Sequence, residues 1–444
     1  MKNVYWKVLS CSFSSATAIY WFGTVIHTFR KEFQDEKVIE TLVQIITVSL
    51  YFPNTFLLLP VLGGIMIDYI GVIPIFQFLN IANVIGAGVF IPGFIYKNIW
   101  LIILASLFFG FSLHLNFTAT YVYLSNTFIT RTKSLRHFQP VLGIYFFVGF
   151  LLLCLPTLVK DSNLFKLGLG GVLVFISTIL CIFLKVKPKQ GYNESIKNAT
   201  ETVPNLSSLL IKDENMDVTF TEFNEKRDED EMNADGILVF LKEGGLKGIL
   251  KIVSLGIILG IILTVNVSRI FITSKEHTEP LPQYISSIRF GSCAIFGFIL
   301  SRMKWKKRKL ENTIIFTTVI YIAFLVLAGI LSPEIAEVAK IGIFAVLNIT
   351  IGINTYLIYL YFPHAIKFKI ENMGKGIGIF WWIVSLQTFL GNWLNRNTIS
   401  ISSLSFDTVI LLPVTLALIV FMVLAFMERS DNKKPRSNSI PISF

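Results

Sequence analysis

Gly143-Ile-Tyr-Phe-Phe147 and Gly378-Ile-Phe-Trp-Trp382 stand 235 residues apart, and each follows a basic loop at the end of an apolar stretch. The stretches before these loops carry Thr120-Tyr121 and Thr355-Tyr356, which are separated by the same offset. In both places an apolar stretch, a basic loop and a second apolar stretch follow one another at the same spacing. This recurrence indicates that the chain contains two copies of one membrane unit.

Apolar stretches of membrane-spanning length extend on both sides of this repeat. Each has at least 18 residues and almost no charge, which is enough to cross a hydrocarbon core about 30 Å thick. Backbone groups in lipid must be hydrogen-bonded within the segment, so such continuous stretches predict helices and exclude a barrel of alternating strands. The twelve stretches are 8–29, 41–67, 73–96, 99–128, 138–159, 164–184, 252–271, 281–300, 313–331, 341–361, 377–394 and 408–427.

We therefore expect an all-α polytopic membrane protein with twelve transmembrane helices in two pseudo-symmetric six-helix bundles. The expected bundles are residues 1–184 and 252–428, followed by a tail at 429–444. The connector, 185–251, holds 13 of the 28 carboxylates, a composition that predicts disorder over most of its length. Its last part, 237–250, is interpreted either as an amphipathic helix on the membrane surface or as an extension of the seventh span.

Composition limits the possible functions. Only 15% of residues are charged and 53% are hydrophobic, so no large water-soluble domain is expected. The net charge of +11 is explained by basic loops of a membrane protein, and we expect no nucleic-acid partner. The four cysteines, Cys11, Cys154, Cys181 and Cys293, lie in apolar stretches without metal-ligand spacing. We expect no metal and no cofactor.

Lys and Arg are more frequent in the tails and short loops on the side of the two termini than in the opposite loops. The run from Arg302 to Lys309 contributes most to this difference. Because basic loops stay in the cytoplasm, both termini are predicted to be cytoplasmic. We expect a monomer in the plasma membrane rather than in an internal membrane.

Between the second and third stretches the chain reads Gly64-Ile-Met-Ile-Asp68-Tyr-Ile-Gly71, echoed 233 residues later by Gly297-Phe-Ile-Leu-Ser301. This motif in this loop, with the six-plus-six layout, resembles the major facilitator superfamily over nearly the whole chain. The resemblance implies a gate motif, in which Gly64 and Gly71 allow close approach. Asp68 would accept hydrogen bonds from a neighbouring helix N-terminus or pair with a basic residue. Tyr69 and Val72 depart from the family pattern, because basic residues are usual there.

A second, shorter resemblance concerns the branch that carries large neutral amino acids and its protozoan relatives. It rests on Leu124-Ser125-Asn126-Thr127-Phe128 and on Gly374-Lys375-Gly376-Ile377-Gly378 followed by Leu386-Gln387. This resemblance implies an amino-acid substrate.

Arg289 lies eight residues into the eighth stretch, near the middle of the membrane, and no Asp or Glu lies at comparable depth in the sequence. A guanidinium without a carboxylate partner is a candidate for binding a substrate carboxylate through its planar fork. The alternatives are that it bonds helix carbonyls or reaches toward the membrane surface. Further candidate substrate-binding residues are Tyr20, His114, Asn116, Asn266, Asn354 and Tyr356. Trp381 and Trp382 are interpreted as aromatic residues at the membrane surface.

These observations predict a facilitative carrier or exchanger that moves a small carboxylate-bearing solute, most simply an amino acid, by alternating access. His114 is the one deep titratable group other than Cys and Tyr, so coupling to protons is not expected. A carrier of a sugar, nucleoside or organic anion remains an alternative, as does a receptor or scaffold that does not transport. No HExxH motif and no pair of deep carboxylates is present, so an enzyme is not expected.

Overall fold

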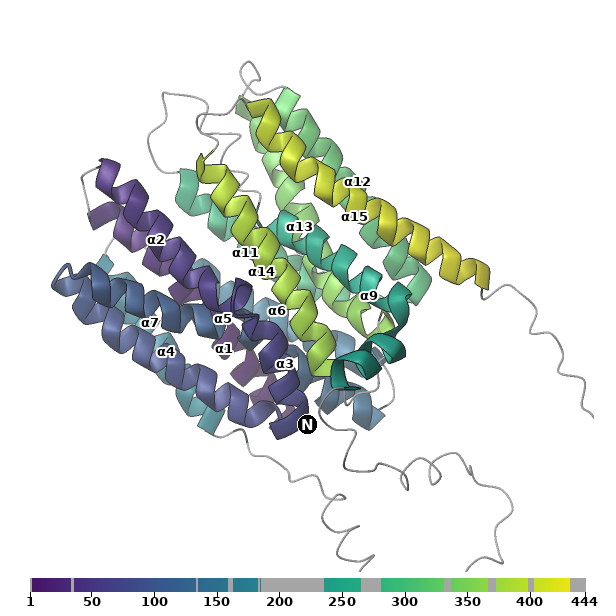
Figure 1. Cartoon of the computed structure of the whole chain (residues 1–444), viewed down its shortest axis with the longest axis horizontal. Helices are drawn as coiled ribbons and strands as arrows, with labels where there is room; N and C mark the ends of the chain where they lie inside the picture. Colours follow the sequence, from purple (N-terminus) through teal and green to yellow (C-terminus); the bar gives the residue numbers. More distant parts are fainter. Residues whose placement is uncertain are drawn as a thin grey trace, which may run out of the picture.

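The computed structural model describes residues 2–32, 36–132, 135–158, 163–182, 184, 235–264, 281–330, 337–365, 373–397 and 403–431. Within these ranges the chain is helical, and its two halves lie side by side (Figure 1). The first half contains α1 (Lys2–Glu32), α2 (Glu36–Thr55), α3 (Leu59–Ile70), α4 (Val72–Ile95), α5 (Ile99–Thr132), α6 (Leu135–Leu158) and α7 (Asn163–Ile182). The second half contains α9 (Asp235–Thr264), α11 (Leu281–Ser301), α12 (Lys307–Ile330), α13 (Glu337–Ala365), α14 (Met373–Asn397) and α15 (Ser403–Asp431).

With α2 and α3 counted as one interrupted span, these helices correspond one to one with the twelve predicted stretches. Over their described residues, eight spans are long and apolar enough to cross a membrane, and shorter apolar segments lie in α6 and α11. The predicted fold class is confirmed. Residues 237–250 belong to the continuous helix α9. Most of the connector, 185–234, lies outside the described residues.

The second span is broken, which the sequence analysis did not predict. Helix α2 ends at Thr55 and α3 begins at Leu59, with Leu58 between them in the left-handed region at a φ of 52°. Pro60 explains the break, because its ring has no N–H and would collide with the carbonyl four residues earlier in a continuous helix. Proline is well tolerated in the first turn, which is where α3 places it.

Buried polar side chains connect the helices of the first half. Asn116 in α5 donates to the Ser14 hydroxyl of α1 at 2.6 Å and accepts from Ser15 at 3.2 Å. Tyr145 in α6 donates to Ser15 at 3.0 Å, and Asn80 in α4 lies 3.4 Å from Ser14. Because lipid offers these groups no partners, such bonds between helices help fix the bundle.

Charged side chains connect the helices of the second half near the end of the molecule where α1 begins and α15 ends, called the terminal side below. Glu311 of α12 is buried, accepts from Arg429 of α15 at 3.0 Å and lies 3.9 Å from Lys251 of α9. Glu428 of α15 binds both Lys251 and Lys307. This charge cluster ties α9, α12 and α15 together.

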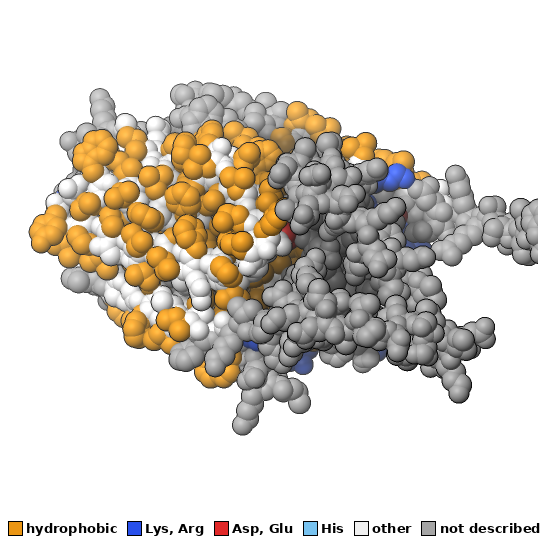
Figure 2. All heavy atoms as spheres, turned by 60° about the horizontal axis from the view of Figure 1, so that its bottom comes forward, with side chains coloured by type: hydrophobic (Ala, Val, Ile, Leu, Met, Phe, Trp, Pro, Cys, Tyr) orange, Lys and Arg blue, Asp and Glu red, His pale blue; other side chains and the backbone are white. Residues whose placement is uncertain are grey.

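The outer surface of the first half is densely covered with hydrophobic side chains (Figure 2). Phe78 and Ile81 of α4 and Phe175 of α7 are more than half exposed. In water such a surface would drive association, whereas in a bilayer it contacts acyl chains. The exposed apolar surface therefore marks the part of the molecule that faces lipid.

We expect Glu311→Ala to lower stability, because it removes a partner of buried Lys251 and the acceptor of the Tyr361 hydroxyl at 2.7 Å. Breaking a buried ion pair on one side costs about 3 kcal/mol. The apparent melting temperature of the detergent-purified protein should fall clearly, while exposed Lys304→Ala on the same side should leave it unchanged. Equal melting temperatures for both variants would show that the charge cluster does not hold the helices.

Candidate functional site

The two halves meet most extensively along two seams, one between α3 and α14 on the terminal side and one between α6 and α11. Glycines allow the close approach in both seams. A Cβ on Gly64 would collide with the carbonyl of Gly374, and one on Gly143 would collide with the Ser301 side chain. The seams are therefore built for backbone contact between helices of different halves.

Asp68, in the predicted gate motif, joins the two halves directly. Its two carboxylate oxygens accept hydrogen bonds from the backbone N–H groups of Gly374 at 2.8 Å and Lys375 at 2.9 Å. These donors lie in the first turn of α14, where N–H groups have no partner within the helix and the helix dipole favours negative charge. Gly71 follows at a φ of 92°, a conformation that suits glycine, and turns the chain into α4.

The corresponding position of the second half has no such bond. Ser301 occupies the place of Asp68 in the repeat, and its hydroxyl donates to the Phe298 carbonyl of its own helix at 2.6 Å. Ser301 packs against Gly143 of α6 without a charge. The seam between α3 and α14 is thus held by charge-assisted hydrogen bonds, and the seam between α6 and α11 by close packing at this level.

The break between α2 and α3 lies against α14 of the other half. The indole of Trp382 donates to the Thr55 carbonyl at 3.0 Å, at the end of α2, where carbonyls lack partners within the helix. The hydroxyls of Thr55 and Ser385 lie 3.0 Å apart. Trp382 therefore contacts the other half rather than the membrane surface, contrary to the sequence interpretation. The reason is that α14 begins at Met373 and places Trp382 well inside the bundle.

A cluster of five aromatic residues, the aromatic plug, fills the space between the halves. Trp381 stacks on Phe117 of α5 with ring centroids 4.5 Å apart and packs against Tyr359 of α13 at 5.7 Å. Tyr121 donates to the Tyr359 carbonyl at 2.9 Å, and Phe146 lies 5.1 Å from the Tyr359 ring. Trp381 is only 3% exposed, so its assignment to the membrane surface was also wrong.

His114 lies next to the aromatic plug in the middle of α5. It stands 11 residues before Ser125, about 16 Å along the helix, which is near mid-membrane depth. Its ring lies between Tyr51 of α2 at 6.4 Å and Trp381 at 5.7 Å. The imidazole is 4% exposed, and its Nδ1 atom has no hydrogen-bond partner among the described residues.

Arg289 lies at a similar depth in α11, 12 residues before Ser301 or about 18 Å along the helix. One guanidinium nitrogen donates to the Leu263 carbonyl near the end of α9, as the alternative based on helix carbonyls expected. A guanidinium has five N–H donors, so most of them have no partner among the described residues. Within the described ranges, no Asp or Glu oxygen lies within 4.0 Å of its nitrogens.

The guanidinium of Arg289 lies within electrostatic range of Cys293 of its own helix, of Tyr321 of α12 and of Tyr51 of α2 in the first half. The Tyr321 hydroxyl is buried and has no hydrogen-bond partner in the described part of the chain. Arg289, His114, Tyr51 and Tyr321 form the central cluster. Within the described residues it combines a cation that has no carboxylate partner with the Nδ1 atom of His114 and the hydroxyl of Tyr321, one from each half, which have no hydrogen-bond partner there.

The other predicted site residues are placed differently. Tyr20 donates to a backbone carbonyl of α7 at 2.6 Å, and Asn116 is committed to the polar network of the first half. Asn354 accepts from a threonine of α12 at 2.6 Å, while its Nδ2 atom has no partner among the described residues. Tyr356 donates to a carbonyl of α6 at 3.3 Å, across the halves. Asn266 lies outside the described residues.

Tyr51, Tyr321 and the aromatic plug were not predicted from the sequence. The sequence did contain a hint of the aromatic plug, because Trp381 and Phe146 stand at equivalent positions of the repeated motif. In the described ranges, no group of three His, Cys, Asp or Glu is arranged to hold a metal ion. The four cysteines are buried free thiols.

No family model and no curated protein sequence matches the chain. Solved structures match over nearly its full length. A bacterial homologue of the iron transporter ferroportin, in an outward-facing state, has a TM-score of 0.58 at 13% identity and covers 95% of this chain and 98% of its own. The human organic anion transporter MFSD10 (TETRAN) has a TM-score of 0.61 at 11% identity, with coverages of 96% and 97%. Likeness at such low identity concerns the fold, and the chain has the major facilitator fold of these transporters.

Proposed function

We propose that the protein is a membrane carrier that works by alternating access between two rocking halves, 1–184 and 252–428. The observation that carries this proposal is Arg289, a guanidinium near mid-membrane depth that has no carboxylate partner among the described residues. A charge within the membrane that has no carboxylate partner among the described residues is costly, so its presence at this depth favours a binding role.

The described contacts between the halves support a conformation closed on the terminal side. The bonds of Asp68, the Trp382 indole and the aromatic plug all lie between this side and the central cluster. With both termini in the cytoplasm, as the basic loops predict, this conformation faces outward. The matching ferroportin homologue was also solved in an outward-facing state.

A change to the opposite conformation requires separation of the terminal side. That step would break the Asp68 bonds and open the aromatic plug below the central cluster. A bound solute that contacts both halves can supply the free energy for this change, because Tyr51 and His114 come from one half and Arg289 and Tyr321 from the other. Binding of the solute would then be coupled to the conformational change through the same side chains.

For the substrate we propose a small solute with a carboxylate. The guanidinium of Arg289 can bind a carboxylate in the bidentate geometry, and the Tyr321 hydroxyl and the His114 imidazole offer further hydrogen bonds. An amino acid is the first candidate, on the strength of the sequence resemblance in the fourth and eleventh spans.

An organic anion is the second candidate, and charge balance favours it. A zwitterionic amino acid carries no net charge and would leave the guanidinium charge uncompensated, whereas a monoanion would neutralise it. One of the matching structures is itself an organic anion transporter. Competition between a labelled amino acid and a monocarboxylate of equal size, with the purified protein in liposomes, separates these candidates.

Facilitated diffusion or exchange is the proposed mode, because the central cluster in its described part has no carboxylate that could carry a proton. A receptor or scaffold with this fold would keep the closed terminal side and show no flux at all. Measured uptake by reconstituted protein therefore separates a carrier from that alternative.

We expect Asp68→Asn to favour opening of the terminal side. The variant loses the negative charge and replaces one acceptor oxygen with an NH2 group that faces a backbone N–H. Hydrogen bonds to a charged group contribute about 1.5 to 3 kcal/mol, so the closed population should fall about tenfold or more relative to the open one.

Spin labels at exposed Tyr69 and Lys304, on opposite halves, would report this change as a longer distance. The four native thiols are buried and should not compete for label. Ser301→Ala is the matched control at the equivalent position of the repeat, and it should leave the distance distribution unchanged. An unchanged distance distribution for Asp68→Asn would contradict the proposal that Asp68 holds the terminal side closed.

We expect Arg289→Ala to reduce uptake of the carboxylate solute at least 100-fold, because it removes two charge-assisted hydrogen bonds. Arg302→Ala, at the exposed end of the same helix, is the matched control and should retain uptake. Arg289→Lys should recover only part of the activity, since an ammonium group lacks the planar fork. Full uptake by folded Arg289→Ala protein would remove this residue from the site.

A further inference from the structure

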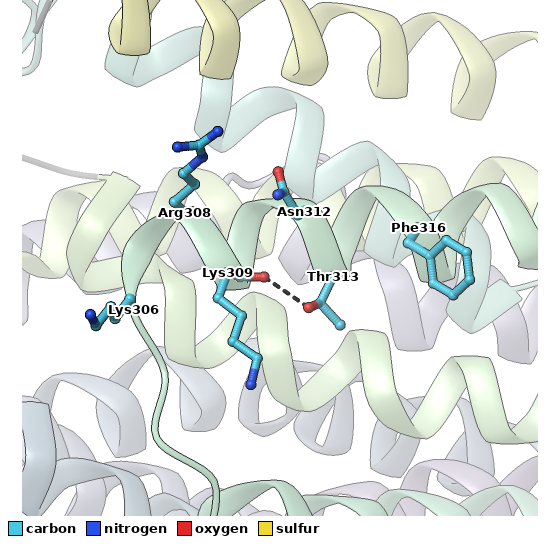
Figure 3. A pocket seen from close by; sticks show the side chains of 6 residues that line it. All are labelled: Lys306, Arg308, Lys309, Asn312, Thr313 and Phe316. Atoms are coloured by element: carbon cyan, nitrogen blue, oxygen red, sulfur yellow. Dashed lines mark hydrogen bonds between the residues drawn. The ribbon is translucent and has the colours of Figure 1, made fainter. Parts of the chain in front are cut away.

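A hollow of about 520 Å³ lies along α12 at its beginning (Figure 3). Its lining comes from three consecutive turns of one stretch of chain. The residues are Lys306, Arg308, Lys309, Asn312, Thr313 and Phe316.

The three basic residues of the hollow are exposed and have no carboxylate partner within the described chain. The nearest acidic residues, Glu311 and Glu428, already bind other cations in the charge cluster. Lys309 contacts the ring of Trp305 at 5.2 Å, which leaves its ammonium group accessible. The hollow thus carries three uncompensated positive charges, which attract an anion.

Polarity changes along the hollow in the direction of the membrane interior. Thr313 lies four residues after Lys309, about 6 Å along the helix, and Phe316 lies about 10 Å along it. Asn312 accepts from Arg429 at 2.7 Å and keeps its NH2 group as a donor. Phe316 is 64% exposed on the apolar surface of α12.

This order matches one leaflet of a bilayer. The interfacial layer between water and hydrocarbon is about 5 to 7 Å thick on each side. The basic residues would therefore lie at the level of lipid phosphates, the amide and hydroxyl at the level of the ester groups, and Phe316 among the acyl chains. A soluble anion would use only the first of these three levels.

The equivalent stretch of the first half has no basic residue. It begins at Gly71 and continues as Val72-Ile73-Pro74-Ile75. The hollow is therefore a property of the second half alone, and not a consequence of the duplicated architecture.

We propose that this hollow binds the headgroup phosphate of an anionic phospholipid in the leaflet on the terminal side. The occupant would be held by Arg308 and Lys309, with Phe316 against its acyl chain. Each Lys or Arg near the membrane surface contributes about 1 kcal/mol to binding of anionic lipid, so loss of two should weaken binding about 30-fold.

The test is a titration of the full-length, detergent-purified protein with phosphatidylserine, followed by native mass spectrometry. Arg308→Gln/Lys309→Gln should lower the affinity about 30-fold. Arg302→Gln/Lys304→Gln removes two exposed charges from the same loop outside the hollow and should change it less than twofold. Phosphatidylcholine should bind equally weakly to all three proteins.

Two further arms separate the possible ligands. Phe316→Ser should weaken phosphatidylserine binding several-fold, and inorganic phosphate should not displace the lipid at millimolar concentration. Displacement by phosphate, with no effect of Phe316→Ser, would identify a soluble-anion site and overturn the proposal. Equal weakening by both charge pairs would also overturn it, because it would show diffuse attraction instead of a site. None of these readouts depends on transport activity.

Discussion

The structure depends most on the bond between one carboxylate and the beginning of one helix. Asp68 accepts from two backbone N–H groups of α14 and so joins the two halves on the terminal side. This bond exists only because Gly64 lets the helices come close enough, and because Gly71 turns the chain sharply after α3. The glycines supply the approach and the carboxylate supplies the attraction. The seam between α3 and α14 uses both, since a carboxylate farther away would be solvated and could not accept from the N–H groups of α14.

Most of the fold could be predicted from the sequence, because a bilayer leaves few choices. A stretch of the length of 99–128 without charge has to form a helix in lipid, and the offset between Thr120 and Thr355 shows the duplication directly. The position of Arg289 near mid-membrane depth followed from its place in the eighth stretch. The proline break at Pro60 was missed, although its physical cause lies in one residue, because apolar length alone does not distinguish one helix from two.

The candidate site was harder to predict, because a buried polar residue in a membrane protein can either bind substrate or hold helices together. Asn116 and His114 are two residues apart in the same helix. Both amide atoms of Asn116 are hydrogen-bonded within its own half, whereas the Nδ1 atom of His114 has no partner among the described residues. Only the neighbours of each side chain decide between these uses, and those neighbours come from distant helices. Trp381 illustrates the same limit, since its burial is set by where α14 begins and not by its own type.

The two halves have diverged in how they use charge on the terminal side. In the first half the charge is Asp68, which faces inward and binds the other half. In the second half the equivalent position is the neutral Ser301, and the charges of the following loop face outward around Arg308 and Lys309. The hydrogen bonds that Asp68 accepts weaken steeply with distance and misalignment. The packing of small residues such as Gly143 against Ser301 instead tolerates sliding. In the proposed carrier cycle, the seam held by Asp68 would release and the seam between α6 and α11 would act as the pivot, so the two halves would move differently from each other.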